Sequence, residues 1–372
     1  MCCDKHTDGG KLMSFYLRDK KISEKIIQDL KQLNQKFQIM HVCGTHQDTL
    51  IRFGLDYVFH QCNIKILQGP GCPICVTTPR EIEECLLLAR AGKTIATFGD
   101  MMRVPGERES LKSLREQGYD INIVYGIQDA VKLAHKKKEV VFMAIGFETT
   151  APSTASILLN NPPSNFSILN CHRYVPPVLQ YIMEQGNIQL DGIIEPGHVS
   201  AIIGVHPYEF LSRDYGIPQV VTGFEPMDLL MGVWMIIQQI KNNIARVENE
   251  YKRVVKYDGN MKALSIMKKI FTPKDIKWRG FPVIPHSFMA LREEFWKYDA
   301  RIRYEDVLQE ISTRDLKEPP GCRCGEVLRG IISSHECPLF GIQCTPRTPV
   351  GPCMVSREGS CNIDFRYRKN ND

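Results

Sequence analysis

A strand, a turn and a helix start follow one another in the segment Phe37-Gln38-Ile39-Met40-His41-Val42-Cys43-Gly44-Thr45-His46-Gln47-Asp48. Residues 37–42 form a largely apolar run, which is typical of a buried strand. Gly44 allows a tight turn, and Thr45 with Asp48 three residues later resembles a helix capping box. The segment therefore predicts a strand that ends near Cys43 and a helix that begins beside this cysteine.

Seven further apolar runs follow at 64–67, 94–98, 121–125, 140–145, 166–170, 192–194 and 219–222. Helical patterns separate them, as expected for parallel strands covered by helices on both faces. Eight strands can form one sheet, a barrel or two sheets, and the long helical stretch that opens at Pro226 favours two sheets over a barrel. The predicted fold class is α/β, with two Rossmann-like parallel-sheet domains at 1–125 and 126–256 and a small cysteine-rich C-terminal domain at 257–372.

The composition is that of an ordinary globular protein. Of 372 residues, 43% are hydrophobic and 24% charged, so a large core can form. The formal net charge of +5 is spread along the chain, which argues against nucleic acid as a partner. The sequence has no apolar run long enough to span a bilayer and no secretory signal pattern at its start, so we expect a cytoplasmic protein without a membrane partner. Fourteen cysteines in such a protein indicate metal binding or redox chemistry.

A second cysteine loop follows the run at 64–67, in Gln68-Gly69-Pro70-Gly71-Cys72-Pro73-Ile74-Cys75. Two cysteines three positions apart can share one metal or close a small disulfide. A helix start follows, with Thr78 as the cap, Pro79 at the first helical position and Glu81 completing a capping box, and Gly92 marks the helix end.

The carboxyl ends of parallel strands gather at one edge of a sheet, where ligands bind. Cys43, His46, Cys72 and Cys75 all follow predicted strands, so they are the candidate functional residues. A helix N-terminus beside Cys43 favours its thiolate form, and His46 is placed to accept a proton, to donate a hydrogen bond or to bind a metal. Similar loops carry Asp100, Arg103, Glu148, His198 and Glu225, for which a structural role such as helix capping is an equal alternative.

Six more cysteines lie between Cys322 and Cys361, among frequent prolines and glycines. Four thiolates can hold zinc or a [4Fe–4S] cluster. The paired knuckles usual for zinc are absent, so the irregular spacing favours the cluster. The two remaining cysteines can form a disulfide next to it. Outside these sets, Cys62, Cys85 and Cys171 have no metal spacing and are predicted to be small buried side chains, while Cys2 and Cys3 are predicted to have no role.

Together these loops resemble the HypD family of hydrogenase maturation factors, from about His41 to Tyr367. The motifs that carry the resemblance are His41-Val42-Cys43-Gly44-Thr45-His46, Gly69-Pro70-Gly71-Cys72-Pro73-Ile74-Cys75, Phe98-Gly99-Asp100-Met101-Met102-Arg103-Val104-Pro105-Gly106, Gly146-Phe147-Glu148-Thr149-Thr150-Ala151-Pro152, Pro196-Gly197-His198-Val199-Ser200, Cys324-Gly325-Glu326-Val327-Leu328-Arg329-Gly330 and Cys353-Met354-Val355-Ser356-Arg357-Glu358-Gly359-Ser360-Cys361. One departure is Gln47, where many relatives have Glu, so a carboxylate at this position is not required.

The resemblance implies an assembly function. Members of this family work with HypC to hold the iron that becomes the Fe(CN)2CO unit of [NiFe]-hydrogenase. HypE, as part of the HypE–HypF cyanide-delivery system, delivers the cyanide. It also implies two α/β domains and a C-terminal [4Fe–4S] domain. Cys43 is then the lead iron ligand with His46 beside it, and Cys72 and Cys75 are a redox pair that can also approach the iron.

For the C-terminal set, the resemblance implies a cluster bound by Cys324, Cys337, Cys344 and Cys361, with Cys322 and Cys353 as a relay pair. Two rival functions fit the same residues. One is a thiol–disulfide reductase in which the cluster reduces Cys72 and Cys75. The other is a structural zinc protein with a binding function.

Overall fold

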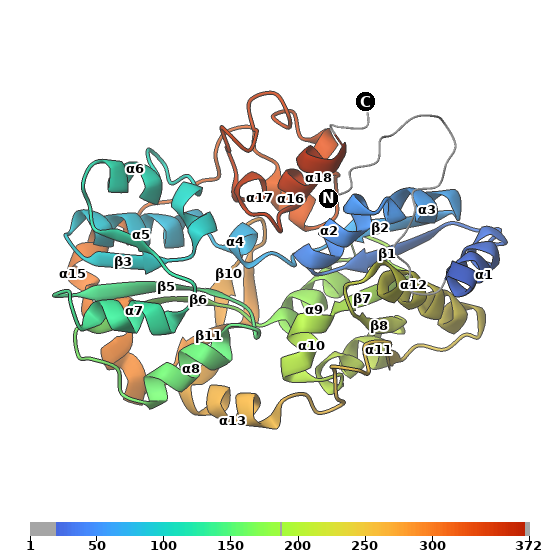
Figure 1. Cartoon of the computed structure of the whole chain (residues 1–372), viewed down its shortest axis with the longest axis horizontal. Coiled ribbons are helices and arrows are strands. Elements are labelled where there is room, and N and C mark those ends of the chain that lie inside the picture. The colour runs from blue at the N-terminus through green and yellow to red at the C-terminus, as the bar shows by residue number, and fades with distance from the viewer. Residues whose placement is uncertain (1–19, 187, 369–372) are drawn as a thin grey trace, which may run out of the picture.

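The structure is a computed structural model, and it describes residues 20–186 and 188–368. It contains two parallel sheets, each covered by helices, and a cysteine-rich segment that lies across both (Figure 1). The predicted α/β class and the two parallel sheets are confirmed. Cys2 and Cys3 lie outside the described residues.

The first sheet has the strand order β2-β1-β7-β8-β9, and all its pairings are parallel. Its strands are β1 (Phe37–His41), β2 (Ile64–Gln68), β7 (Gly192–Pro196), β8 (Gln219–Thr222) and β9 (Val247–Asn249). The helices that belong to this half are α1 (Lys20–Lys31), α2 (Gly44–Arg52), α3 (Leu55–Gln61), α10 (Gly197–Ile203), α11 (Glu209–Tyr215) and α12 (Pro226–Lys241), with the 3₁₀ helix η2 (His206–Tyr208). Strand order reverses between β1 and β7, which makes the carboxyl ends of these two strands a topological switch point.

The second sheet has the order β4-β3-β5-β6, again with parallel pairings. Its strands are β3 (Thr94–Thr97), β4 (Ile121–Ile123), β5 (Val140–Gly146) and β6 (Phe166–His172). The helices that follow its strands or flank them are α5 (Pro79–Arg90), α6 (Leu111–Glu116), α7 (Ile127–Ala134) and α8 (Ala151–Leu159), with η1 (Gly99–Arg103). Every residue of β5 is buried, because helices cover both faces of the sheet.

The expected division of the sheets near residue 125 is wrong. All eight predicted strands are present, with ends displaced by two residues or fewer. However, β3 and β4 share a sheet with β5 and β6, whereas β7 and β8 join the sheet of β1 and β2. The chain leaves the first sheet through α4 (Pro73–Val76) and α5, and it comes back through α9 (Val175–Gln185). Local hydrophobic patterns locate strands but do not state which strands pair, so the error lies in assuming that consecutive strands share a sheet.

The region 257–311 packs mainly with the second half of the molecule. Helix α13 (Met261–Ile270) lies against α8 and also contacts α10, and the antiparallel hairpin of β10 (Phe271–Lys277) and β11 (Val283–Leu291) contacts β6 and α9. The short helices that complete this region are η3 (Glu293–Tyr298), α14 (Ala300–Arg303), α15 (Glu305–Leu308) and η4 (Gln309–Ile311). The sequence did not predict β9 or this hairpin, because β9 is short and prolines interrupt the hairpin region.

The cysteine-rich segment is mostly irregular. Its helices are α16 (Cys324–Leu328), η5 (Ser334–Glu336), α17 (Pro352–Val355) and α18 (Ser360–Arg368). It lies between the two halves, with α18 against α2 and α17 against α4 (Figure 1). One buried core unites parts of all three regions, among them Val42, Cys75, Val175, Trp278 and Cys353. Within the described ranges, none of the helices combines the length and apolar character needed to cross a bilayer.

Candidate functional site

Cys43 lies at the topological switch point of the first sheet. Strand β1 ends at His41, and Cys43 is the N-cap residue of α2, which starts at Gly44. The predicted capping box is wrong, because the N-cap residue is Cys43, two positions before Thr45. The Thr45 hydroxyl instead donates to Glu358 over 3.4 Å, and Asp48 pairs with Arg366 over 3.1 Å. The predicted position of Cys43, between a strand end and a helix start, is confirmed.

Burial decides the protonation of this thiol. Cys43 is 7% exposed, and burial together with the Glu358 carboxyl raises the pKa of Cys43 to about 11. The backbone N–H groups of His46 and Thr45 act in the opposite direction, as the helix start predicts, but their effect is smaller. The expected thiolate is therefore not favoured by the protein alone, and a bound cation is what would stabilise it.

The loop of Cys43 and the loop of Cys72 are in direct contact. The Gly44 N–H donates to the Gly71 carbonyl over 3.4 Å. Gly71 packs so closely on the Cys43 backbone that a Cβ at this position would stand 2.2 Å from the Cys43 nitrogen. The two cysteine loops, predicted to gather at one sheet edge, do lie side by side.

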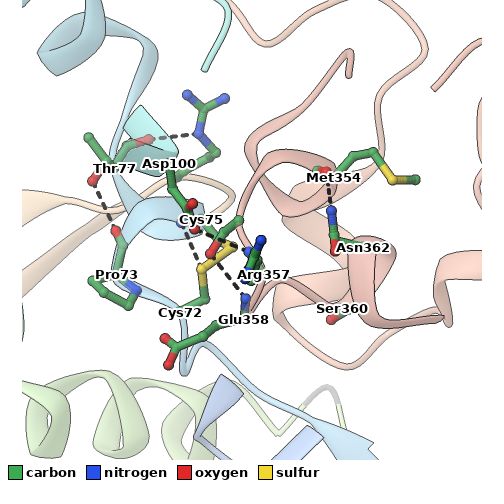
Figure 2. Close-up of a disulfide and its surroundings, with 12 residues drawn as sticks. Cys72, Pro73, Cys75, Thr77, Asp100, Met354, Arg357, Glu358, Ser360 and Asn362 are labelled. Carbon is green, nitrogen blue, oxygen red and sulfur yellow. Dashed lines mark hydrogen bonds between the residues drawn. A yellow bond between two sulfur atoms is a disulfide. The ribbon is translucent and has the colours of Figure 1, made fainter. Parts of the chain in front are cut away.

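Cys72 and Cys75 form a disulfide at the start of α4, and both are fully buried (Figure 2). This is one of the two alternatives that their spacing left open. The Cys75 N–H also donates to the Cys72 sulfur over 3.2 Å. Helix α4 packs against α16, which carries Cys324, and against α17, which carries Cys353. The disulfide therefore lies between the Cys43 loop and the cysteine-rich segment.

Two buried arginines hold the chain after this disulfide. The predicted capping box of Thr78 and Glu81 is confirmed, and Glu81 also pairs with Arg173 over 2.6 Å. Arg173 lies over the Trp278 ring, 5.6 Å from its centre. The Arg279 guanidinium donates to the Thr77 carbonyl over 2.7 Å. These contacts tie the disulfide loop to β6 and to the hairpin region of the second half.

His46 is fully buried and points toward β8. Its Nε2 donates to the Gly223 carbonyl over 2.9 Å and lies 3.1 Å from the Thr222 hydroxyl. Burial, together with the nearby His41 ring, lowers the pKa of His46 to about 3, so the ring is neutral. Nδ1 has no hydrogen-bond partner among the described residues. His46 can therefore accept a hydrogen bond or bind a metal through Nδ1. Whether it acts as a proton acceptor, a hydrogen-bond donor or a metal ligand stays a prediction.

Glu358 is a site residue that the sequence reasoning missed. It comes from the cysteine-rich segment, yet its backbone lies against Gly44, where an added Cβ would stand 2.6 Å from the Glu358 carbonyl oxygen. Partial desolvation raises the pKa of its carboxyl. Figure 2 shows Glu358 beside the Cys72–Cys75 disulfide. The motif from Cys353 to Cys361 was considered only for its two cysteines. The carboxylate between them was the signal that the sequence offered.

The other predicted loop residues mostly have structural contacts. Asp100 accepts from the Arg357 N–H over 3.2 Å, and Arg103 donates to the Pro346 carbonyl over 2.9 Å, so both attach the cysteine-rich segment to the second half. His198 stacks on Phe224 with ring centres 3.8 Å apart. Glu225 caps α12, as the structural alternative predicts.

The cysteines of the C-terminal segment approach one another closely. Hydrogen bonds from Cys324 and Cys353 lower the pKa of Cys361 to about 6, although burial alone raises it. The hydrogen bond from Cys322 to Cys324 raises the pKa of Cys322. Cys337 and Cys344 are buried in the same segment. No ready-made group of three or more His, Cys, Asp or Glu side chains in metal-binding geometry is present among the described residues. Cys62, Cys85 and Cys171 are buried free thiols, as predicted.

Comparison with known proteins decides the family. The model of the family described as "HypD: Hydrogenase formation hypA family" matches residues 18–368. The chain belongs to the HypD family. A putative hydrogenase expression/formation protein of Methanocaldococcus jannaschii is 46% identical over 361 residues, which cover 95% of this chain and 99% of the relative. The hydrogenase maturation factors HypD of Escherichia coli and Cupriavidus necator are 40% and 37% identical, and the alignments cover 89% and 95% of this chain and 89% and 97% of those relatives.

For a HypD-family chain, the positions of the motifs are informative. The first two motifs meet at the Cys43 and Gly71 contact, and the last motif supplies Glu358 to the same place. Three segments that are far apart in the sequence therefore meet at the carboxyl end of β1. Residues of the third motif, Asp100 and Arg103, fasten the segment that brings Glu358 there.

Proposed function

We propose that this HypD-family chain is a cytoplasmic scaffold that holds iron at Cys43 while the Fe(CN)2CO unit of [NiFe]-hydrogenase is assembled. HypC would share the iron, and HypE, as part of the HypE–HypF cyanide-delivery system, would deliver the cyanide. The observation that carries the proposal is the meeting of Cys43, the Cys72–Cys75 disulfide and Glu358 at one switch point. Sulfur ligands suit an iron that must accept strongly bound carbon ligands.

The protein's own residues have separate roles in this proposal. Cys43 supplies the thiolate once iron displaces its proton, and the Glu358 carboxyl adds negative charge near this thiol. His46 offers Nδ1 as a second donor or as a hydrogen-bond acceptor. Reduction of the Cys72–Cys75 disulfide takes up two electrons and two protons and yields two thiols beside the iron site, where they can serve as further ligands.

The cysteine-rich segment supplies the kind of donor that an iron–sulfur cluster needs, which supports the proposal. Its donors are thiols, and a small residue makes room for sulfur: a Cβ on Gly351 would meet the Cys324 and Cys322 sulfurs at 2.5 and 2.7 Å. A [4Fe–4S] cluster bound there would supply one-electron transfer close to α4.

The contacts of Cys353 favour a set of four cluster ligands that differs by one residue from the sequence-based set. Cysteines that exchange a disulfide have to be adjacent. The side-chain partners of Cys353 are Cys324 and Cys361. Of these two, Cys324 has the larger effect on the pKa of Cys353. We therefore propose Cys324 and Cys353 as the thiol pair, and Cys322, Cys337, Cys344 and Cys361 as the cluster ligands.

The burial of the disulfide bears on the rival functions. A thiol–disulfide reductase has to present its thiols to a protein substrate, whereas Cys72 and Cys75 are 0% exposed. Burial favours an internal role in the maturation site over a general reductase. A structural zinc protein would bind zinc and lack acid-labile sulfide, which metal and sulfide analysis of anaerobically purified protein distinguishes.

The test of the proposed function is Cys43→Ala, with Cys62→Ala as the matched control because Cys62 is another buried free thiol in the same half. We expect infrared bands of iron-bound CN and CO in the complex with HypC for the wild type and for Cys62→Ala. Cys43→Ala should lose them. Unchanged bands in Cys43→Ala would remove Cys43 from the iron site.

A further inference from the structure

A cavity of about 530 Å³ lies at the carboxyl ends of β5 and β6, apart from the cysteine loops. Residues that border it come from the segments after these strands, from the end of α10 and η2, from the start of α13 and from the hairpin. Figure 1 shows the ends of β5 and β6 and helix α10 near the middle of the view, with α13 at its lower edge. Its volume is in the range of small-molecule sites. None of the described residues that line it is a cysteine, so the proposed iron function does not use it.

Glu148 lines this cavity and is the strongest sign of a ligand. Its side chain is 0% exposed. Oε1 accepts from the Val175 N–H over 3.0 Å, so Glu148 caps α9 and not the helix that follows it in sequence. Oε2 has no hydrogen-bond partner among the described residues. Leaving a buried carboxyl oxygen unpaired costs free energy, and burial raises the pKa of Glu148 to about 8. Without a ligand, the site therefore holds this carboxyl mainly in its protonated form near neutral pH, and a cation that pairs with Oε2 would bind with release of that proton.

The charge of the lining indicates the sign of the ligand. Its carboxyl and imidazole side chains are the buried Glu148 and, at its exposed rim, Asp258, His206 and His286, and its described residues include neither lysine nor arginine. The N-terminus of α9 borders the cavity, but it offers little to an anion. Glu148 already takes the Val175 N–H, and the next two residues, Pro176 and Pro177, have no N–H to donate. The buried part of the site therefore offers a carboxyl group and no basic side chain, which favours a cation.

The walls suit an apolar body. Pro176, Pro177, Pro207 and Pro273 line the cavity with rigid apolar rings, and Tyr174 adds an aromatic face. The Tyr174 N–H donates to the Ser287 carbonyl over 2.9 Å, which anchors this residue to the hairpin. An organic cation gains from such a face through cation–π attraction, in addition to its pairing with a carboxylate.

The topology of the second sheet also supports a ligand site at this cavity. Its order, β4-β3-β5-β6, reverses between β3 and β5, and Glu148 follows the carboxyl end of β5. Open parallel sheets bind ligands at the carboxyl ends of the strands at such a reversal. Cys43 occupies the corresponding position in the first sheet, so each half of the molecule carries chemistry at its own switch point.

We propose that this cavity binds a small organic cation, whose ammonium group pairs with Glu148 while its apolar body packs against Tyr174 and the prolines. The site goes beyond the proposed iron function and does not depend on it.

The test uses three probes of similar shape with the full chain: benzylammonium, benzyl alcohol and benzoate. Ligand-observed NMR titration should show benzylammonium binding at least tenfold more tightly than benzyl alcohol, with benzoate the weakest. Glu148→Gln should reduce benzylammonium to the affinity of benzyl alcohol, because the amide keeps the shape and loses the charge. Glu294→Gln, on an exposed carboxylate of η3, is the matched control and should bind as the wild type does.

A second variant keeps the test decisive if Glu148→Gln does not fold. Met261 borders the cavity and is 65% exposed, so Met261→Trp fills the entrance at little cost to the core. It should weaken benzylammonium and benzyl alcohol alike. A wild type that binds none of the probes, that binds benzoate as tightly as benzylammonium, or that keeps its benzylammonium affinity in both variants would overturn the proposal.

Discussion

The contact between the two cysteine loops predicts a large effect for Gly71→Ala. The Cβ of an alanine at this position would stand 2.2 Å from the Cys43 nitrogen and 2.4 Å from its Cα. Ordinary contacts of a Cβ begin near 3.4 Å, so the loops would have to separate by about 1.2 Å, the difference between 3.4 and 2.2 Å. The atoms in the way are backbone atoms, which cannot rotate aside as a side chain does. The substitution therefore changes the relative position of Cys43 and the disulfide without removing any ligand.

The cost can be estimated from overpacked cores. Inserting one extra carbon where none fits destabilises a protein by about 1–3 kcal/mol. The Gly44 to Gly71 hydrogen bond would also be lost, which adds about 0.5–1.5 kcal/mol. We expect a lower midpoint of thermal unfolding. More specifically, we expect the infrared CN and CO bands of the complex with HypC to be weakened or shifted, because the iron site is assembled from both loops.

Gly99→Ala provides the matched control, since its Cβ would meet only the Ile123 side chain at the ordinary distance of 3.7 Å. This variant should unfold near the wild-type temperature and keep the bands. A Gly71→Ala protein with wild-type stability and unchanged bands would show that the close approach of the two loops does not matter.

Two further predictions concern the support of the site. Glu81→Gln leaves the Arg173 guanidinium buried without its carboxylate, so we expect a loss of about 3–5 kcal/mol in the free energy of unfolding near neutral pH, measured by urea titration. Burial alone raises the pKa of Glu81, but Arg173 and Arg301 hold it below its usual 4.5. The difference in the free energy of unfolding between wild type and Glu81→Gln is therefore complete above pH 4.5 and shrinks as the pH falls below it. A difference that does not change with pH would contradict this pairing. For the cysteine-rich segment, Cys322→Ser should lose iron, labile sulfide and brown colour after anaerobic purification, whereas Cys324→Ser should keep them. The reverse result would return Cys324 to the cluster and exclude it from the pair with Cys353.

Much of the fold could be predicted from local patterns. A strand buried on both faces has to be a continuous apolar run, so β5 and β6 were recognisable without any partner. The Thr78, Pro79 and Glu81 signal located α5, because capping is a local interaction within one turn. Cys43 and the Cys72–Cys75 pair were predicted at strand ends for the same reason, since a glycine turn after an apolar run is visible in the sequence.

Three features needed the tertiary structure. The placement of β3 and β4 in one sheet with β5 and β6, instead of with β1 and β2, depends on how the chain crosses between the halves. The protonation of Cys43 follows from burial and from Glu358, which is more than three hundred positions away and outweighs the helix end that the sequence shows. Glu148 looked like a cap for the helix that follows it, and only packing revealed that it caps α9, keeps one oxygen unpaired and lines a cavity.

The sequence by itself determined where the strands, the helix starts and the reactive sulfurs lie along the chain, because each depends on neighbours within a few residues. The tertiary structure alone decided which loops meet, which carboxyl stands beside Cys43, and which polar atoms are left unpaired. The physical reason is that burial and contact between distant segments set these energies, and no local pattern carries that information.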